Sequence, residues 1–88
     1  MFRLWGKAIK NSRTVFDKTV EDSSSLNRTK KIFNAIESIC KEFDLSSPIW
    51  LDSNVSEFKR LSKTRFNADN FIDSIDFDYL EISVIEED

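Results

Sequence analysis

Alternation of apolar and polar positions near the start of the chain predicts a β-hairpin. Residues 2–10 and 14–21 are rich in β-branched and aromatic side chains, and the turn-forming segment Asn11-Ser12-Arg13 lies between them. With a three-residue loop, one face of the hairpin carries Leu4, Ala8, Phe16 and Val20. Lys7 then lies opposite Asp17 on the other face, whereas a two-residue loop would place Phe16 on the face of Lys7. The pattern therefore favours the three-residue loop.

A helical spacing of apolar residues follows, from about Leu26 to Phe43. The polar segment 21–25 before it can supply an N-cap. The apolar positions that repeat with a helical period are Ile32, Phe33, Ile36, Ile39, Cys40 and Phe43. This spacing predicts one helix that buries a single face.

The middle of the chain predicts a short strand and a second helix. Pro48 stops a helix, and the apolar run Pro48–Leu51 is typical of a short strand. Asp52 or Ser53 is placed to cap a helix near Asn54 to Ser62. The residues of that helix expected to face inward are Val55, Phe58 and Leu61. Residues 63–73 are expected to form a loop or part of another short helix.

Residues 77–85 alternate as a half-buried strand does, with Leu80, Ile82 and Val84 on one side. The predicted order is β-β-α-β-α-β. It favours a two-layer α+β fold, in which a mainly antiparallel sheet (the hairpin, the short strand and the C-terminal strand) carries two helices on one face. We expect the C-terminal strand to pair next to the hairpin.

Composition favours one domain spanning residues 1–88. The chain is 40% hydrophobic and 12% aromatic, which is sufficient for a packed interior. It has no apolar run near the roughly 18 residues of a membrane span and no signal-peptide-like start. A single cysteine, Cys40, allows no internal disulfide. We therefore expect a cytoplasmic protein without a membrane partner.

The absence of histidine and the single glycine exclude several kinds of site. Ser-His-Asp and Cys-His nucleophile activation need an imidazole, and common phosphate-binding loops need several glycines. We expect no cofactor and no catalytic residues of these types.

Charge is split along the chain. Residues 1–65 hold 13 bases and 8 acids, a net of +5, whereas residues 66–88 hold 8 acids and no base. Cross-strand pairing between an acidic C-terminal strand and basic neighbours explains most of this split. The alternative is that the strand, or the terminal Glu86-Glu87-Asp88, meets a basic partner.

Two groups of bases are candidates for anion binding. Arg28, Lys30 and Lys31 lie at the predicted start of the first helix, where the helix dipole disfavours positive charge. A second group surrounds Phe66 and consists of Lys59, Arg60, Lys63 and Arg65. Together they could hold a phosphate ligand or track a nucleic-acid backbone. The alternatives are pairing with acids elsewhere in the fold and a solvated helix face.

Clustered carboxylates in the last third of the chain raise the question of a metal site. The series is Asp69, Asp73, Asp76, Asp78 and Glu81. Its spacing matches neither an EF-hand loop nor the acidic motif of many metal-dependent nucleases. Solvated carboxylates are favoured, and a carboxylate-dependent enzyme using Asp73, Asp76 and Asp78 is the least favoured function.

Apolar residues on the outer face of the hairpin indicate a protein interface. Trp5, Ile9 and Val15 share the face opposite Leu4 and Ala8. Tryptophan is enriched in the centres of interfaces, so this face predicts a protein partner or self-association. The alternative is that another element of the same chain covers it.

Several stretches resemble a family of short uncharacterised proteins from anaerobic Gram-positive bacteria. They are Leu4-Trp5-Gly6-Lys7, Phe43-Asp44-Leu45-Ser46-Ser47-Pro48-Ile49-Trp50-Leu51, Glu57-Phe58-Lys59-Arg60, Lys63-Thr64-Arg65-Phe66 and Ile75-Asp76-Phe77-Asp78-Tyr79-Leu80-Glu81. The resemblance implies a bacterial, free-standing single-domain protein and transfers no functional residue. The residues themselves favour a small non-enzymatic protein-interaction module, with nucleic-acid or phosphate binding as the second hypothesis.

Overall fold

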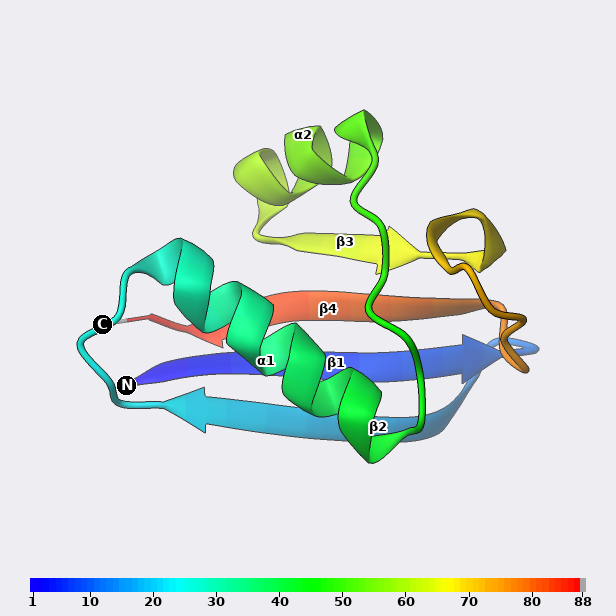
Figure 1. Ribbon diagram of the computed structural model, residues 1–88, viewed down its shortest axis with the longest axis horizontal. Coiled ribbons are helices and arrows are strands. Elements are labelled where there is room, and N and C mark those ends of the chain that lie inside the picture. Colours follow the sequence, from blue (N-terminus) through cyan, green and yellow to red (C-terminus); the bar gives the residue numbers. More distant parts are fainter. Residues whose placement is uncertain (88) are drawn as a thin grey trace.

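One four-stranded antiparallel sheet forms the base of the computed structural model, which describes residues 1–87 (Figure 1). Its strands are β1 (Phe2–Lys10), β2 (Arg13–Asp22), β3 (Lys63–Phe66) and β4 (Tyr79–Glu86), in the spatial order β2-β1-β4-β3. The other elements are α1 (Arg28–Glu42), α2 (Asp52–Leu61) and a 3₁₀ turn, η1 (Ala68–Asn70). The predicted α+β class is confirmed, and β4 pairs with β1 of the hairpin as expected. No helix among the described residues is long and apolar enough to cross a membrane.

The hairpin turn has two residues, not the predicted three. Asn11 and Ser12 both have positive φ, at 52° and 65°, which is the geometry of a two-residue turn that matches the twist of the strands. The pairing then shifts register between Ala8 and Ile9, so that one extra residue of β2 bulges there. Beyond the bulge, Ala8 faces Phe16 and Lys7 faces Asp17. The predicted faces are therefore correct, although the loop length is wrong.

Helix α1 crosses one face of the sheet and encloses the core (Figure 1). Its N-cap is Asn27, whose side chain accepts a hydrogen bond of 2.9 Å from the backbone N–H of Lys30. The side chains that meet between helix and sheet include Leu4, Ala8, Ile36, Ile39, Cys40, Leu80 and Ile82. Phe33 was predicted to face inward with them, but half of its surface is exposed.

The predicted strand at Pro48–Leu51 is not formed, and β3 was not predicted. Residues 44–51 cross from α1 to α2 as an extended connection (Figure 1). In this connection the Leu45 N–H donates to the Cys40 carbonyl (2.7 Å), and the Ile49 N–H donates to the Asn70 carbonyl (2.6 Å). Ser62, at a positive φ of 56°, ends α2 and turns the chain directly into β3. The observed order is therefore β-β-α-α-β-β.

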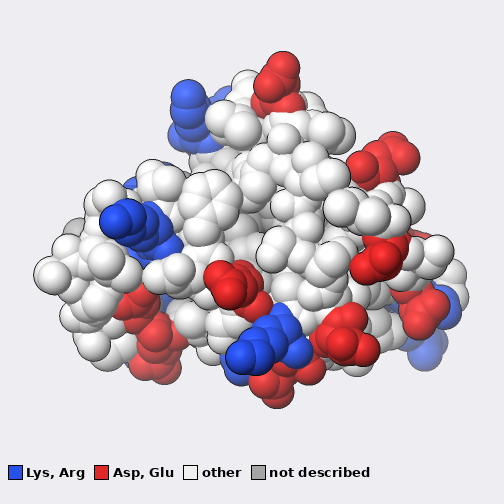
Figure 2. Space-filling view, in the orientation of Figure 1, with Lys and Arg blue, Asp and Glu red and all other residues white. Residues whose placement is uncertain are grey.

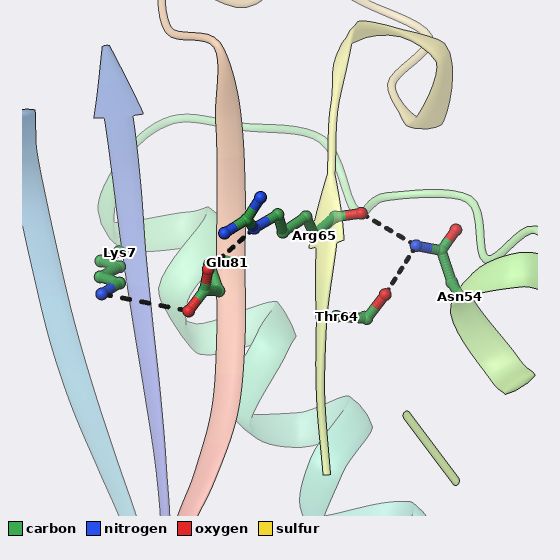
Figure 3. A network of polar contacts seen from close by, with 5 residues as sticks. All are labelled: Lys7, Asn54, Thr64, Arg65 and Glu81. Atoms are coloured by element: carbon green, nitrogen blue, oxygen red, sulfur yellow. Dashed lines mark hydrogen bonds and ion pairs between the residues drawn. The ribbon is translucent and has the colours of Figure 1, made fainter. Parts of the chain in front are cut away.

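Helix α2 begins earlier than predicted and lies beside β3, the edge of the sheet furthest from β2 (Figure 1). Leu51, not Asp52 or Ser53, is the N-cap residue, and its N–H donates to Oδ1 of Asn54 (3.1 Å). Asn54 also donates to Oγ1 of Thr64 and to the Arg65 carbonyl, each at 2.9 Å (Figure 3). The helix therefore lies along the β3 edge, and its Asn54 satisfies the Arg65 carbonyl, which would otherwise be free to pair with another strand.

Candidate functional site

A groove of about 270 Å³ runs between α1 and α2. Its lining comes from the first half of α1, from the connection at Trp50 and from one side of α2, and consists of Arg28, Thr29, Ile32, Phe33, Trp50, Val55, Phe58 and Lys59. Figure 2 shows an uncharged area in the upper middle of this face, with an Asp or Glu side chain just below it and Lys, Arg, Asp and Glu towards its margins. The groove is therefore an apolar depression within a charged surface.

Trp50 forms the floor of the groove and connects its two walls. Its ring makes edge-to-face contacts with Phe33 on α1 (5.9 Å between centroids) and with Phe58 on α2 (5.4 Å). Beneath them it contacts the buried Phe66 of β3 (5.1 Å). Edge-to-face pairs at these distances are favourable beyond the area they bury, so the floor is a rigid aromatic cluster.

The walls of the groove remain open to solvent. Phe33 is 51% exposed and Val55 is 39% exposed, although each lies beside a buried aromatic or aliphatic neighbour. Ile49 and Leu51, on either side of Trp50, are also exposed. Grouped exposed apolar side chains are typical of a surface that binds a partner, whereas scattered single ones are not.

The charged residues of the groove are basic. Arg28 contacts the ring of Phe58 (5.4 Å from guanidinium carbon to centroid), donates to Oγ of Ser62 (3.2 Å) and forms an ion pair with Glu87. Lys59 lies on the opposite wall and is exposed. No acidic side chain lines the groove among the residues that the structure describes.

The seven predicted anion-binding bases lie in separate places. Arg28 and Lys59 line the groove, while Lys31 is only 8% exposed and lies near the ring of Phe2. Lys63 and Arg65 are on β3, and Arg65 donates to Glu81 (3.0 Å). The other two, Lys30 and Arg60, are exposed on α1 and α2. The fold therefore distributes these bases over both helices and β3, and the hypothesis of one continuous basic patch stays a prediction.

The open face of the sheet carries the predicted interface residues. No described helix covers it, and Trp5, Ile9 and Val15 belong to its strands. Val15 is exposed and Ile9 is buried. The indole N–H of Trp5 donates to Oδ2 of Asp17 (2.9 Å), and the ammonium of Lys7 lies 4.5 Å from the centre of the ring. The predicted role of these residues in an interface stays a prediction.

A row of alternating charges crosses this open face. Asp17, Lys7, Glu81 and Arg65 are neighbours in register on β2, β1, β4 and β3. Glu81 is central, with Arg65 at 3.0 Å and Lys7 at 4.0 Å (Figure 3). The bond to Glu81 raises the pKa of Arg65 above its already high ordinary value. Opposite charges in adjacent strands stabilise a sheet, so this row explains part of the charge split.

Replacing Glu81 by glutamine is expected to destabilise the protein by about 1 kcal/mol at low salt, because two cations then lose their shared carboxylate. Urea denaturation of wild type and variant, repeated in 0.5 M sodium chloride, measures this difference. High salt should reduce it, since salt screens partly exposed charges. Glu21→Gln on the exposed side of β2 is the matched control and should change stability little. A salt-independent loss in Glu81→Gln would contradict the electrostatic explanation.

Other acids of the C-terminal segment also pair with bases earlier in the chain. Glu86 forms ion pairs with the N-terminal ammonium (3.4 Å) and with Arg3 (3.3 Å), and Glu87 pairs with Arg28. The expected internal pairing is thus observed for Glu81, Glu86 and Glu87, and it includes Arg28 at the start of α1. Asp88, the last residue of the predicted acidic tail, lies outside the described residues.

The remaining acids form no metal-holding group among residues 1–87, and the cysteine is buried. Within residues 1–87, no three Asp, Glu, His or Cys side chains are arranged to hold a metal ion. One of the predicted carboxylates, Asp78, accepts from the backbone N–H of Asn11 (2.9 Å) and so supports the hairpin turn. Burial raises the pKa of the Cys40 thiol to about 11, which keeps it protonated at neutral pH.

Sequence periodicity did not identify the groove. It assigned Phe33 and Val55 to the inward faces of their helices, and it could not show that the two helices stand apart at these positions. One signal in the sequence could have indicated the groove. Ile49, Trp50 and Leu51 are consecutive apolar residues, and an extended segment that packs on one side only cannot bury all three side chains. No protein-family model, no curated protein and no solved structure matches this chain significantly.

Proposed function

We propose that this chain is a small, non-enzymatic protein-interaction module that binds its partner in the groove between α1 and α2. The observation that carries the proposal is the exposure of Phe33 and Val55 on facing walls above the Trp50 floor. Exposed apolar side chains around a preformed depression bind a partner's side chain without prior rearrangement. The groove also contains Trp50 and Arg28, and tryptophan and arginine are enriched among the residues that dominate binding energy at interfaces.

The groove has a better composition for an interface than the open face of the sheet. On the sheet, Glu81 already pairs with Lys7 and Arg65, and Asp17 accepts from Trp5, so covering this row would remove four charges from water. In the groove, Phe33 and Val55 provide exposed apolar surface whose burial is favourable, at roughly 25 cal/mol per Å². The groove therefore supports the interaction hypothesis more strongly than Trp5, Ile9 and Val15 do.

Site-specific photocrosslinking tests the proposal. A benzophenone side chain replaces Val55 in the groove in one variant and Val15 on the sheet in the other, because both positions carry exposed valines. In cells that express the protein, we expect a defined crosslinked species from position 55 and none from position 15. The crosslink should disappear when Phe33→Asp is added, provided that circular dichroism shows an intact fold.

Either of two results would contradict the proposal. A crosslink from position 15 alone would move the interface to the open sheet face. Absence of crosslinks from both positions would remove the support for an interaction module.

A further inference from the structure

Arg28 connects the groove with a second, polar hollow beside it. That hollow also measures about 270 Å³ and is lined by Phe2, Arg28, Lys31 and Glu87. The guanidinium of Arg28 lies near the ring of Phe58, which lines the groove, and forms an ion pair with Glu87, which lines the polar hollow. One base of the groove is therefore already engaged by a carboxylate of the same chain.

The ion pair between Arg28 and Glu87 can exchange with another carboxylate. The two side chains are 46% and 44% exposed, and pairs this exposed contribute little net stability. Glu87 follows the last residue of β4 and takes no part in the pairing of the strands. A carboxylate from outside can therefore replace Glu87 at Arg28 without disturbing the sheet.

Lys59, the other base of the groove, has no acid beside it. It is exposed and forms no ion pair with a described acid, and no acidic side chain lines the groove within residues 1–87. A partner that covers the groove without a negative charge would remove this ammonium from water with no compensation. Charge complementarity therefore favours a partner that places a carboxylate here.

The apolar part of the groove is small and aromatic. Its volume of about 270 Å³ lies below the roughly 300–1,000 Å³ of typical ligand pockets, so it suits one bulky side chain and not a whole helix. Phe33 and Trp50 meet edge to face, and a further ring or branched aliphatic side chain packs well against such a pair.

We propose that the groove recognises a partner protein through a short acidic segment that carries one bulky apolar side chain. The apolar side chain enters between Phe33 and Val55, and the flanking carboxylates meet Lys59 and Arg28. Glu87 competes for Arg28 from within the chain and so weakens this binding. The inference rests on the proposed function, because it states the chemistry of the partner that occupies the same groove.

Three five-residue peptides, blocked at both ends, are the probes. Each has a central phenylalanine, flanked on both sides by two glutamates in the first, two glutamines in the second and two lysines in the third. They are titrated into the ¹⁵N-labelled full chain in about 50 mM salt, which screens exposed charges only partly. In the NMR spectra, the indole N–H of Trp50 reports on the groove and that of Trp5 on the open face of the sheet.

We expect the glutamate peptide to shift the Trp50 signal at concentrations about two- to fivefold lower than the glutamine peptide does, which is the effect of one exposed ion pair. The lysine peptide should bind least, although the net charge of −3 on the chain would by itself favour it. The Trp5 signal should not move. Alanine in place of the central phenylalanine should abolish the shift, since the apolar side chain then leaves the groove empty.

Matched variants test the bases and the competing acid separately. Glu87→Gln leaves Arg28 unpaired and should strengthen binding of the glutamate peptide about two- to fivefold, with no effect on the glutamine peptide. Glu86→Gln changes the net charge equally but leaves the Arg28 pair in place, so it is the control. Lys59→Gln should reduce the preference for glutamate, whereas Arg60→Gln, at an exposed position outside the groove, should not.

Two results would overturn the inference. Equal binding of the glutamate and glutamine peptides to wild type would show that the groove does not select an acidic segment. Equal effects of Glu87→Gln and Glu86→Gln would show that Glu87 does not compete at Arg28.

These failures are distinguishable from failure of the proposed function. If the three peptides shift Trp50 equally, the groove still binds an apolar side chain, and only the acidic preference is wrong. If no peptide shifts Trp50 while position 55 still crosslinks in cells, the groove binds a partner of different chemistry. If no peptide shifts Trp50 and neither position crosslinks, both proposals are wrong.

Discussion

Replacement of Asn54 by leucine will destabilise the protein by about 3 to 5 kcal/mol, more than any surface substitution in this chain. The buried amide of Asn54 uses all of its hydrogen-bonding capacity. It accepts from the Leu51 N–H (3.1 Å) and from the amide of Asn70 (2.8 Å), and it donates to Thr64 and to the Arg65 carbonyl. Leucine has the same branched arrangement of side-chain heavy atoms and is larger, so no cavity forms, and the loss reports four broken hydrogen bonds together with crowding by the two methyl groups.

The same substitution should also disrupt the groove, because Asn54 belongs to a network that fixes Trp50. Asn70 donates to the Ile49 carbonyl (2.7 Å) and receives the Ile49 N–H on its own backbone carbonyl. Ile49 and Leu51 are thereby held on both sides of Trp50. We expect Trp50 fluorescence to report solvent exposure in Asn54→Leu under conditions where the protein is still folded, measured in a Trp5→Phe background.

Urea denaturation gives the stability difference, and Asn34→Leu on the exposed surface of α1 is the matched control. The control should lie within about 0.5 kcal/mol of wild type. A loss below about 1 kcal/mol in Asn54→Leu would mean that water or relaxation replaces the lost bonds. The network would then not be what holds α2 against β3.

The elements that depend on local periodicity could be predicted, and β3 shows why others could not. Helix α1 and strand β4 each have a long repeating pattern, and most of their predicted inward residues are buried. Strand β3 has four residues, of which only Thr64 and Phe66 are buried. It exists because β4 supplies hydrogen bonds on one side and Asn54 on the other, and both partners are distant in sequence. No pattern within four residues reports such partners.

In the hairpin, the side chains that share a face were predicted correctly although the predicted length of the loop was wrong. The periodicity of Ala8, Phe16 and Lys7 required one extra residue between the strands, and a three-residue loop supplied it. The protein places the extra residue in a bulge at Val15 and keeps a two-residue turn at Asn11 and Ser12. The count of residues was predictable, whereas their distribution between turn and bulge depends on twist, which a hydrophobic pattern does not contain.

The candidate site was predictable in part for a similar reason. The pairing of C-terminal acids with earlier bases follows from charge and strand order, and it is observed at Glu81 and Glu86. The groove depends on the separation of α1 and α2, which the buried amides of Asn54 and Asn70 set through the Trp50 segment. The sequence places Asn54 at the start of a predicted helix and Asn70 in a loop or short helix, so their shared role in positioning the two long helices was not visible.

Substitution of Gly6 by valine will destabilise the protein by about 3 kcal/mol, because α1 lies too close to β1 for a side chain at this position. A Cβ atom on Gly6 would lie 2.7 Å from Cδ1 and 3.3 Å from Cγ2 of Ile39, which is completely buried. Valine adds two further methyl groups in the same direction. Ile39 cannot leave, because Ala8, Cys40 and Leu80 fill the surrounding core, so the helix must move away from the sheet.

Combining Gly6→Val with Ile39→Ala tests whether this contact is the cause. Ile39→Ala alone should cost about 2 to 5 kcal/mol by leaving a cavity, and the valine methyl groups should fill part of that cavity in the double variant. We therefore expect the double variant to be more stable than the sum of the single losses predicts, by at least about 1 kcal/mol in urea denaturation. Ser83→Val, on the open face of the neighbouring strand β4, is the control for adding a β-branched residue to the sheet. Strict additivity would place the strain of Gly6→Val elsewhere, whereas the expected coupling shows that α1 sets its distance from the sheet through Gly6 and Ile39.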